Sequence, residues 1–118
     1  MIYINTKAKY HNSKTIIDGI KFDSKKESLR YQELKLLLKN GDITELELQP
    51  RFTLQPKYRK NGKTIRKIEY VADFSYRDKK GKHIVEDVKS PATAKDKVYR
   101  IKKKIFEYKY PTLEIKEI

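Results

Sequence analysis

Two acidic residues and a lysine lie inside apolar runs of the segment VADFSYRDKKGKHIVEDVKS, residues 71–90. Asp73 lies within VADF, and Asp87 lies within IVEDVK, where Lys89 follows two residues later. Because side chains alternate across a strand, Asp87 and Lys89 share one face and lie roughly 7 Å apart along it. A strand seldom places acids inside an apolar run, so these three residues are candidates for chemistry.

The polar turn RDKKGK indicates that the two acid-bearing runs pair as antiparallel strands. Counting back from a turn centred near Lys79–Lys80, Asp73 falls opposite residue 86 or 87, close to Asp87. Two buried carboxylates repel each other unless a cation neutralises them, and oxygen ligands of this kind suit Mg²⁺. A divalent ion with a lysine nearby favours attack of water on a phosphodiester.

A salt bridge is the alternative interpretation of the same residues. Asp73 or Asp87 would then pair with Lys89 or Lys82 at a sheet edge, as an isolated D-x-K in a lysine-rich chain usually does. The apolar neighbours of Asp73 favour a site instead. Spacing alone leaves both interpretations open.

The composition indicates one small, strongly basic domain. The chain has 118 residues, and 29 Lys and Arg against 16 Asp and Glu give a net charge of +13. Such a charge attracts a polyanion, most plausibly nucleic acid, although a merely soluble basic surface is the alternative. The absence of cysteine excludes disulfides, cysteine zinc sites and thiol nucleophiles. Without a long apolar stretch, we expect a cytoplasmic protein with no membrane partner.

Two helices are expected. Residues 1–14 are predicted to form an N-terminal arm or irregular lead-in, and residues 15–118 a single domain. Ser24 caps the first helix, with Glu27 three residues on, and Gly41 ends it. The second helix is predicted from about Thr93 to Tyr108, with its apolar positions at Val98, Ile101 and Ile105.

Strands and tight turns fill the rest of the domain. Asp18-Gly19 and Asn61-Gly62 each predict a hairpin turn. Ile43, Leu46 and Leu48 predict a strand that begins near Thr44. A short strand is expected in RFTL, a long one ending at Tyr76 and another at 83–89. The last segment, TLEIKEI, is predicted to lie parallel beside 83–89. The sequence therefore predicts an α/β sheet with one helix on each face or both on one face.

The chain resembles the PD-(D/E)XK nuclease superfamily, and its small phage-encoded members in particular. The motif corresponds to Ala72-Asp73 followed by Asp87-Val88-Lys89, with alanine in place of the proline. DGIKFDSKKESLRYQELKLL, LELQPRFTL and YRIKKKIFEYKYPTLEIKEI extend the resemblance over residues 15–118. It implies a restriction-endonuclease-like αβββαβ core, a central mixed sheet flanked by helices, and Mg²⁺, for which Mn²⁺ can substitute.

The same resemblance implies the roles of the site residues. Asp73, Asp87 and Glu27 would hold the metal, and Lys89 would position or activate the water. Glu27 has a rival explanation, because Ser24-x-x-Glu27 fits a capping box. Glu86 is a rival ligand, although alternation directs it away from Lys89. Gln49 is either near the metal or an ordinary exposed glutamine.

Basic residues in two segments are candidates for contacts with nucleic acid. Residues 57–67 hold no acid, and the second helix is rich in lysine, although a solvated helix face is the usual meaning of such a run. His11 and His83 are isolated and do not support a histidine-based site. The candidates are Arg59, Lys60, Lys63, Arg66, Lys102 and Lys103.

The predicted function is a metal-dependent DNA endonuclease, phage-encoded and acting in the host cytoplasm. The superfamily includes Holliday-junction resolvases, so branched or recombination DNA is a candidate substrate. A homodimer is expected, because one active site serves one strand. The alternatives are a non-catalytic basic nucleic-acid-binding protein on the same fold, and a structural phage or ribosome-associated protein.

Overall fold

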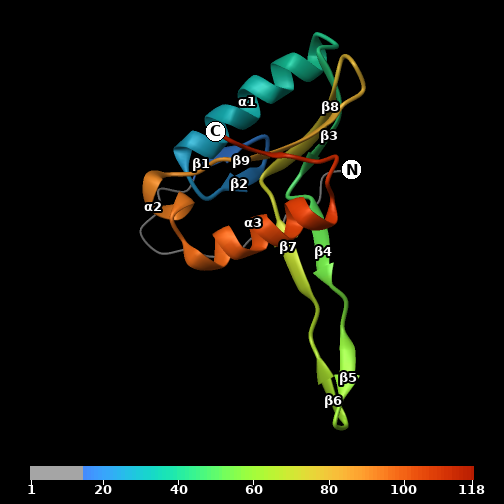
Figure 1. Ribbon diagram of the computed structural model, residues 1–118. Helices are drawn as coiled ribbons and strands as arrows, with labels where there is room; N and C mark the ends of the chain where they lie inside the picture. The colour runs from blue at the N-terminus through green and yellow to red at the C-terminus, as the bar shows by residue number, and fades with distance from the viewer. Residues whose placement is uncertain (1–14) are drawn as a thin grey trace.

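A mixed four-stranded sheet forms the centre of the protein (Figure 1), seen in a computed structural model that describes residues 15–118. The predicted arm, residues 1–14, lies outside the described residues. The strand order is β10–β9–β8–β3, with β10 parallel to β9 and the other pairs antiparallel. The parallel pairing of the last strand is therefore confirmed. The strands span β3 (Ile43–Leu48), β8 (Phe74–Asp78), β9 (His83–Asp87) and β10 (Ile115–Glu117).

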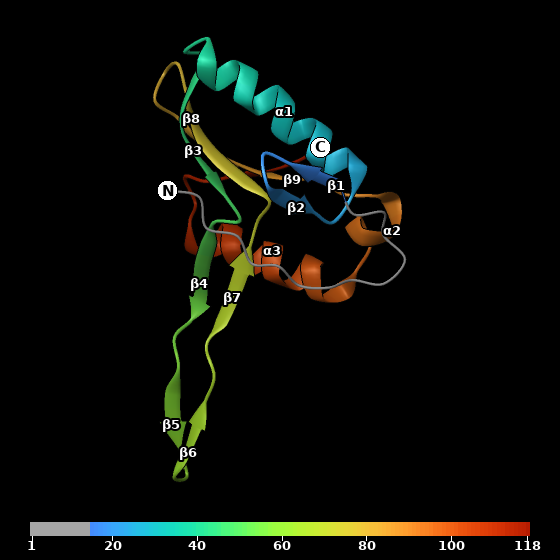
Figure 2. The same cartoon turned by 180° about the vertical axis from the view of Figure 1, so that it is seen from behind.

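One long helix covers each face of this sheet (Figures 1 and 2). Tyr31 and Leu34 of α1 (Lys25–Lys39) belong to one buried cluster with Phe74. Phe106 of α3 (Lys97–Lys109) belongs to a second buried cluster with Val85. Val85 therefore faces α3, whereas the next residue of β9, Glu86, contacts Arg30 of α1, as strand alternation requires.

The start and the end of α1 follow the expected signals. The Ser24 hydroxyl accepts a hydrogen bond from the backbone N–H of Glu27 at 3.1 Å, and the helix ends at Lys39. Gly41, just beyond, has a φ of 77°, a left-handed conformation that glycine adopts without strain. The buried face is narrow, because Leu29 and Leu36 are exposed although they are apolar.

The predicted second helix is in fact two helices. Ser90 caps a short α2 (Pro91–Ala94), and the Asp96 carboxylate accepts from the backbone N–H of Tyr99 at 3.1 Å to begin α3. The expected apolar face was wrong: Val98, Ile101 and Ile105 are exposed.

The buried face of α3 carries the aromatic residues Tyr99 and Phe106 instead. The Phe106 ring packs against Phe52 and Tyr70, with ring centroids 4.8 and 5.3 Å apart. Two apolar stripes compete on this helix, and the aromatic one is buried because larger rings remove more apolar area from water.

A long ribbon projects from the body between β3 and β8 (Figure 1). The expected long strand through Tyr76 was also wrong, because it breaks at Ala72–Asp73. Its first part pairs with β4 and its second part with β3, so the chain changes partner at the break. The ribbon consists of β4 (Arg51–Gln55), β5 (Tyr58–Lys60), β6 (Lys63–Ile65) and β7 (Ile68–Val71).

Both predicted hairpin turns are confirmed. Asp18-Gly19 joins β1 (Thr15–Ile17) to β2 (Ile20–Phe22), and Asn61-Gly62 joins β5 to β6. All four turn residues have a positive φ between 52° and 75°, as a type I′ turn requires. No helix among residues 15–118 is long and apolar enough to cross a membrane.

Candidate active site

The break between β7 and β8 brings Asp73 next to Asp87. The backbone N–H of Asp73 donates to the carbonyl oxygen of Glu86 at 3.1 Å. Its carboxylate oxygen Oδ2 accepts from the backbone N–H of Val88 at 2.7 Å. Since Phe74 pairs with Glu86, the adjacent Asp73 lies beside the last residues of β9. The two aspartates thus meet where β9 ends.

Asp87 is a buried carboxyl, with 2% of the residue exposed. The Tyr70 hydroxyl donates to its Oδ2 atom, and Nζ of Lys89 lies 3.8 Å from the same oxygen. Burial raises the pKa of Asp87 to about 7, against the opposing effects of the Lys89 ammonium and of a hydrogen bond from the Asp73 backbone. The protein therefore holds this carboxyl in an environment that disfavours an uncompensated negative charge.

Lys89 lies between a carboxylate and an aromatic ring. Its Nζ atom is 4.0 Å from the centroid of the Tyr99 ring, a cation–π contact. Its backbone N–H donates to the carbonyl of Ile118 at 3.3 Å, and Ile118 donates to Asp87 at 2.8 Å. The side chain is 20% exposed, so the ammonium is restrained but retains access to solvent.

Glu27 lies in the first turn of α1, near the same end of β9. The neighbouring Lys26 donates from Nζ to the carbonyl oxygen of Lys89 at 2.9 Å, which fixes this turn of the helix against the strand end. The Glu27 residue is buried, with 8% exposed. Within residues 15–118 no group of three or more His, Cys, Asp or Glu side chains converges as a metal cage.

Glu86 has a different environment from its neighbour Asp87. It is fully buried, and Arg30 holds both carboxylate oxygens, with Nε at 2.8 Å from Oε1 and Nη2 at 2.6 Å from Oε2. The Tyr76 hydroxyl also donates to Oε2. The sequence did not predict this ion pair. Its signal was Arg30 on the same helix face as Glu27 and Tyr31, opposite a strand with consecutive acids.

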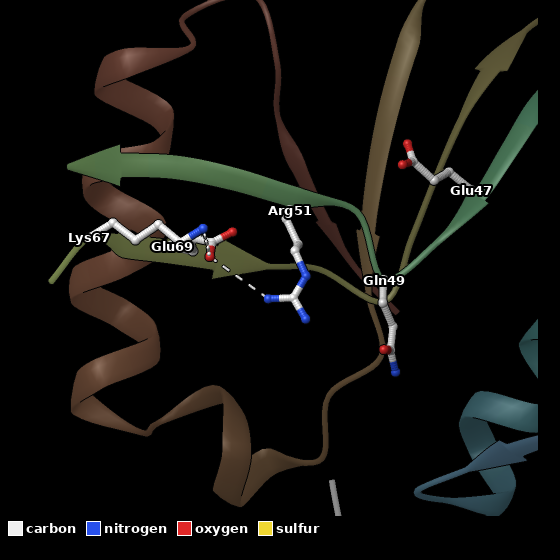
Figure 3. A pocket seen from close by; sticks show the side chains of 5 residues that line it. All are labelled: Glu47, Gln49, Arg51, Lys67 and Glu69. Atoms are coloured by element: carbon white, nitrogen blue, oxygen red, sulfur yellow. Dashed lines mark ion pairs between the residues drawn. The ribbon is translucent and has the colours of Figure 1, made fainter. Parts of the chain in front are cut away.

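Gln49 approaches the site through its backbone. It has a φ of 52°, unusual for a residue other than glycine, and its N–H donates to the carbonyl of Asp73 at 2.9 Å. Figure 3 shows its side chain at the rim of an open pocket of about 630 Å³, whose other lining residues are Glu47, Arg51, Lys67 and Glu69.

Two acids line this pocket, Glu47 and Glu69, and the charge of Glu69 is neutralised by basic neighbours. The Glu69 carboxylate lies 3.0 Å from Lys67 and 3.8 Å from Arg51, as the dashed lines of Figure 3 mark. Gln49 therefore connects Asp73 to a charged surface beside it. The pocket itself offers no second group of buried acids.

The candidate nucleic-acid contacts lie in two places. Arg59, Lys60, Lys63 and Arg66 are exposed on or beside the β5–β6 hairpin. Lys103 of α3 forms an ion pair with Glu117 of β10 at 3.4 Å. The hydroxyl of Tyr99, also on α3, donates to the same Glu117 at 2.6 Å. Lys102, also on α3, is half-buried.

Of the two histidines, the structure describes only His83, and it lies away from the site. His83 begins β9, at the end away from Asp87, and burial lowers its pKa. His11 lies outside the described residues.

Fold and site together define an α/β protein with a central mixed sheet, helices on both faces and an aspartate pair at one strand end. Residues 7–118 match the family described as protein of unknown function (DUF1064), so the chain belongs to that family. Searches of curated proteins and of solved structures found no match.

Proposed function

We propose that the chain is a Mg²⁺-dependent DNA endonuclease with a restriction-endonuclease-like core. The observation that carries the proposal is the meeting of Asp73, Asp87 and Lys89 at the end of β9. The order of α1, β3, β8, β9, α3 and β10 supports it, because the resemblance to PD-(D/E)XK nucleases implies helix, three strands, helix, strand. The β4–β7 ribbon is an insertion in that order.

The donor set at the site suits a hard divalent ion. Mg²⁺ binds through one or two carboxylates and keeps several waters, so it needs no closed cage of side chains. Asp73 and Asp87 would be its ligands, Glu27 would complete the set from α1, and Mn²⁺ can substitute. When bound, the ion supplies positive charge to the scissile phosphate and favours attack by water.

Lys89 is the proposed positioning group for that water. Its ammonium, restrained by Asp87 and the Tyr99 ring, donates a hydrogen bond that orients the water toward phosphorus. Attack forms one P–O bond and breaks the ester P–O bond. The water loses a proton and the leaving oxygen takes one up, so the products are a phosphate monoester and an alcohol.

The basic surface supports a nucleic-acid substrate. The net charge is +13, and exposed cations of the β5–β6 hairpin would contact phosphates without reading sequence. Lys102 and Lys103 of α3 are further candidates, and Lys103 lies close enough to Asp87 to affect its pKa. Cutting both strands of a duplex or a junction would require two copies of the chain, because one site serves one strand. Branched DNA of phage recombination is a candidate substrate.

A cleavage panel tests the proposal. Plasmid, linear, nicked, flapped and four-way-junction DNA are incubated with the protein and Mg²⁺ or Mn²⁺. Asp73→Ala and Lys89→Ala should each abolish cleavage and leave DNA binding largely intact. Glu47→Gln and Lys82→Ala, which change exposed residues outside the site, are the matched controls and should cut normally. Wild-type cleavage by Asp73→Ala or Lys89→Ala would refute the site assignment.

A non-catalytic nucleic-acid-binding protein is the second candidate, favoured by the same net charge. It predicts salt-sensitive DNA binding with no response to divalent metal. If Mg²⁺ and Mn²⁺ neither change thermal stability nor permit cleavage of any substrate in the panel, this candidate replaces the nuclease.

A further inference from the structure

Among residues 15–118, the outer half of the ribbon has no packing partner outside the ribbon itself. At its base, Phe52 of β4 and Tyr70 of β7 pack on Phe106 of α3. Beyond Pro56 the two strands continue as β5 and β6, where every residue is exposed except the half-buried Ile65. Figures 1 and 2 show this hairpin extending far from the sheet. A two-stranded ribbon of this kind is only marginally stable in water by itself, which indicates a surface built for a partner.

The charge of the hairpin identifies the kind of partner. Residues 57–67 carry six lysines and arginines and no acid. Their repulsion opposes the fold of the isolated ribbon, and a polyanion would relieve it. We define this segment, residues 57–67, as the basic ribbon.

The cations lie on both faces of the basic ribbon. Lys60 pairs with Lys63 across the strands, so these two side chains share one face. Arg59 pairs with Thr64 on the opposite face, where its guanidinium donates to the Thr64 hydroxyl at 3.0 Å. A flat anionic surface would engage only one face. A groove with phosphates along both walls would engage both.

The length of the ribbon corresponds to one turn of DNA. Eleven residues separate Gly62 at the tip from Asp73 at the candidate site. At about 3.3 Å per residue, the tip reaches up to about 36 Å from the site. The longest dimension of the protein, 52 Å, accommodates this reach. One turn of B-form DNA is about 34–36 Å, or roughly 10 base pairs.

We propose that the basic ribbon enters the major groove of the same B-form DNA duplex that occupies the candidate active site, about one helical turn from the scissile phosphate. This inference rests on the proposed function and adds a substrate class to it. The major groove of B-form DNA admits a two-stranded ribbon, whereas the deep, narrow major groove of A-form RNA does not. The substrate therefore contains at least about 10 base pairs of DNA duplex on one side of the cut.

Binding experiments without divalent metal test the inference independently of cleavage. The affinity for fluorescent DNA duplexes of 8, 12, 16 and 24 base pairs, and for a 24-base-pair RNA duplex, is measured in EDTA between 50 and 200 mM salt. The test variant is Arg59→Ala/Lys60→Ala/Lys63→Ala. The control is Lys79→Ala/Lys80→Ala/Lys82→Ala, which removes the same charge from the exposed β8–β9 turn at the opposite end of the protein (Figure 1). Circular dichroism verifies that both variants are folded.

On the 24-base-pair DNA, loss of three phosphate contacts should lower the slope of log K against log salt by about 2.7. Between 50 and 200 mM salt, the wild type should therefore lose about 40-fold more affinity than the test variant loses. The control variant should retain the wild-type slope. On the 8-base-pair DNA and on the RNA duplex, the test variant should bind like the wild type.

An unchanged slope for the test variant on the 24-base-pair DNA would overturn the inference. An equal effect on the 8-base-pair DNA would overturn it too, because the ribbon would then cross the duplex beside the site. So would an equal effect on RNA. Ribbon-dependent binding without cleavage in any metal would refute only the nuclease, and cleavage independent of duplex length would refute only the ribbon's role.

Discussion

Arg30→Met should strongly destabilise the protein, because it leaves the Glu86 carboxylate buried without its cation. Glu86 has no exposed surface, and the guanidinium of Arg30 holds both of its oxygens. The bond from Tyr76 remains in the variant, but a hydroxyl does not neutralise a charge. Removing one partner of a buried ion pair costs about 3–5 kcal/mol.

The expected change in melting temperature follows from chain length. With an unfolding entropy of about 2.1 cal/mol/K per residue, 118 residues give about 0.25 kcal/mol/K. A loss of about 4 kcal/mol therefore lowers Tm by about 16 °C. Thermal and urea unfolding followed by circular dichroism measure it.

A second variant separates the buried charge from simple loss of packing. Arg30→Met/Glu86→Leu removes both charges and keeps the volume apolar, so it should recover most of the lost stability. It should also retain metal-dependent cleavage, since Glu86 faces α1 and not the aspartate pair. A loss below about 1 kcal/mol for Arg30→Met, or a double variant no more stable than the single one, would refute the reasoning.

Three further predictions concern the site. Burial raises the pKa of Asp87 to about 7 from 3.8, so the folded state binds this proton more tightly and the carboxyl costs stability as pH rises from about 4 to 7. Asp87→Asn should therefore stabilise the metal-free protein at pH 8 by at most about 4 kcal/mol, as measured by urea unfolding. The gain in stability should vanish near pH 4, and a gain that does not depend on pH would contradict this. Mg²⁺ at 100 times its Kd should raise the stability of the wild type by about 2.7 kcal/mol but should not stabilise Asp73→Ala. Thermal melts with and without EDTA measure this, and equal shifts in Tm for the two proteins would show that the ion binds elsewhere. Tyr70→Phe removes a hydroxyl that donates to Asp87 and should lower the free energy of unfolding by about 1–3 kcal/mol above pH 7. The loss should be smaller at pH 5, where the protonated carboxyl needs no donor. A loss that does not depend on pH would indicate that the hydroxyl contributes through packing alone.

Local signals in the sequence predicted much of the fold. Ser24 and Gly41 delimit α1, and the Asp18-Gly19 and Asn61-Gly62 turns form as expected. The register of the acid-bearing strands also followed from counting, because the polar turn between them is short. Asp73 lies beside Glu86 and Asp87, as the sequence predicted.

Features that depend on tertiary contacts could not be predicted in this way. Nothing local indicates that the chain changes its partner from β4 to β3 at Ala72–Asp73. The sequence before this break (β7) and the sequence after it (β8) have the pattern of one continuous strand. The orientation of α3 likewise depended on which of two apolar stripes meets Phe52 and Tyr70. The role of Arg30 required knowing that α1 lies across Glu86.

Consecutive acids on β9 face opposite sides of the sheet, and this has a consequence for evolution by insertion and deletion. Adding or removing one residue in the 79–82 turn would rotate the strand by one position relative to its neighbours. Asp87 would then face Arg30 and Glu86 the tyrosine-lined side, so the ion pair under α1 and the aspartate pair would be lost together. Selection on the site should therefore preserve the length of this turn across homologues. Its sequence is constrained at Gly81, whose φ of 81° suits glycine, and the exposed lysines can vary.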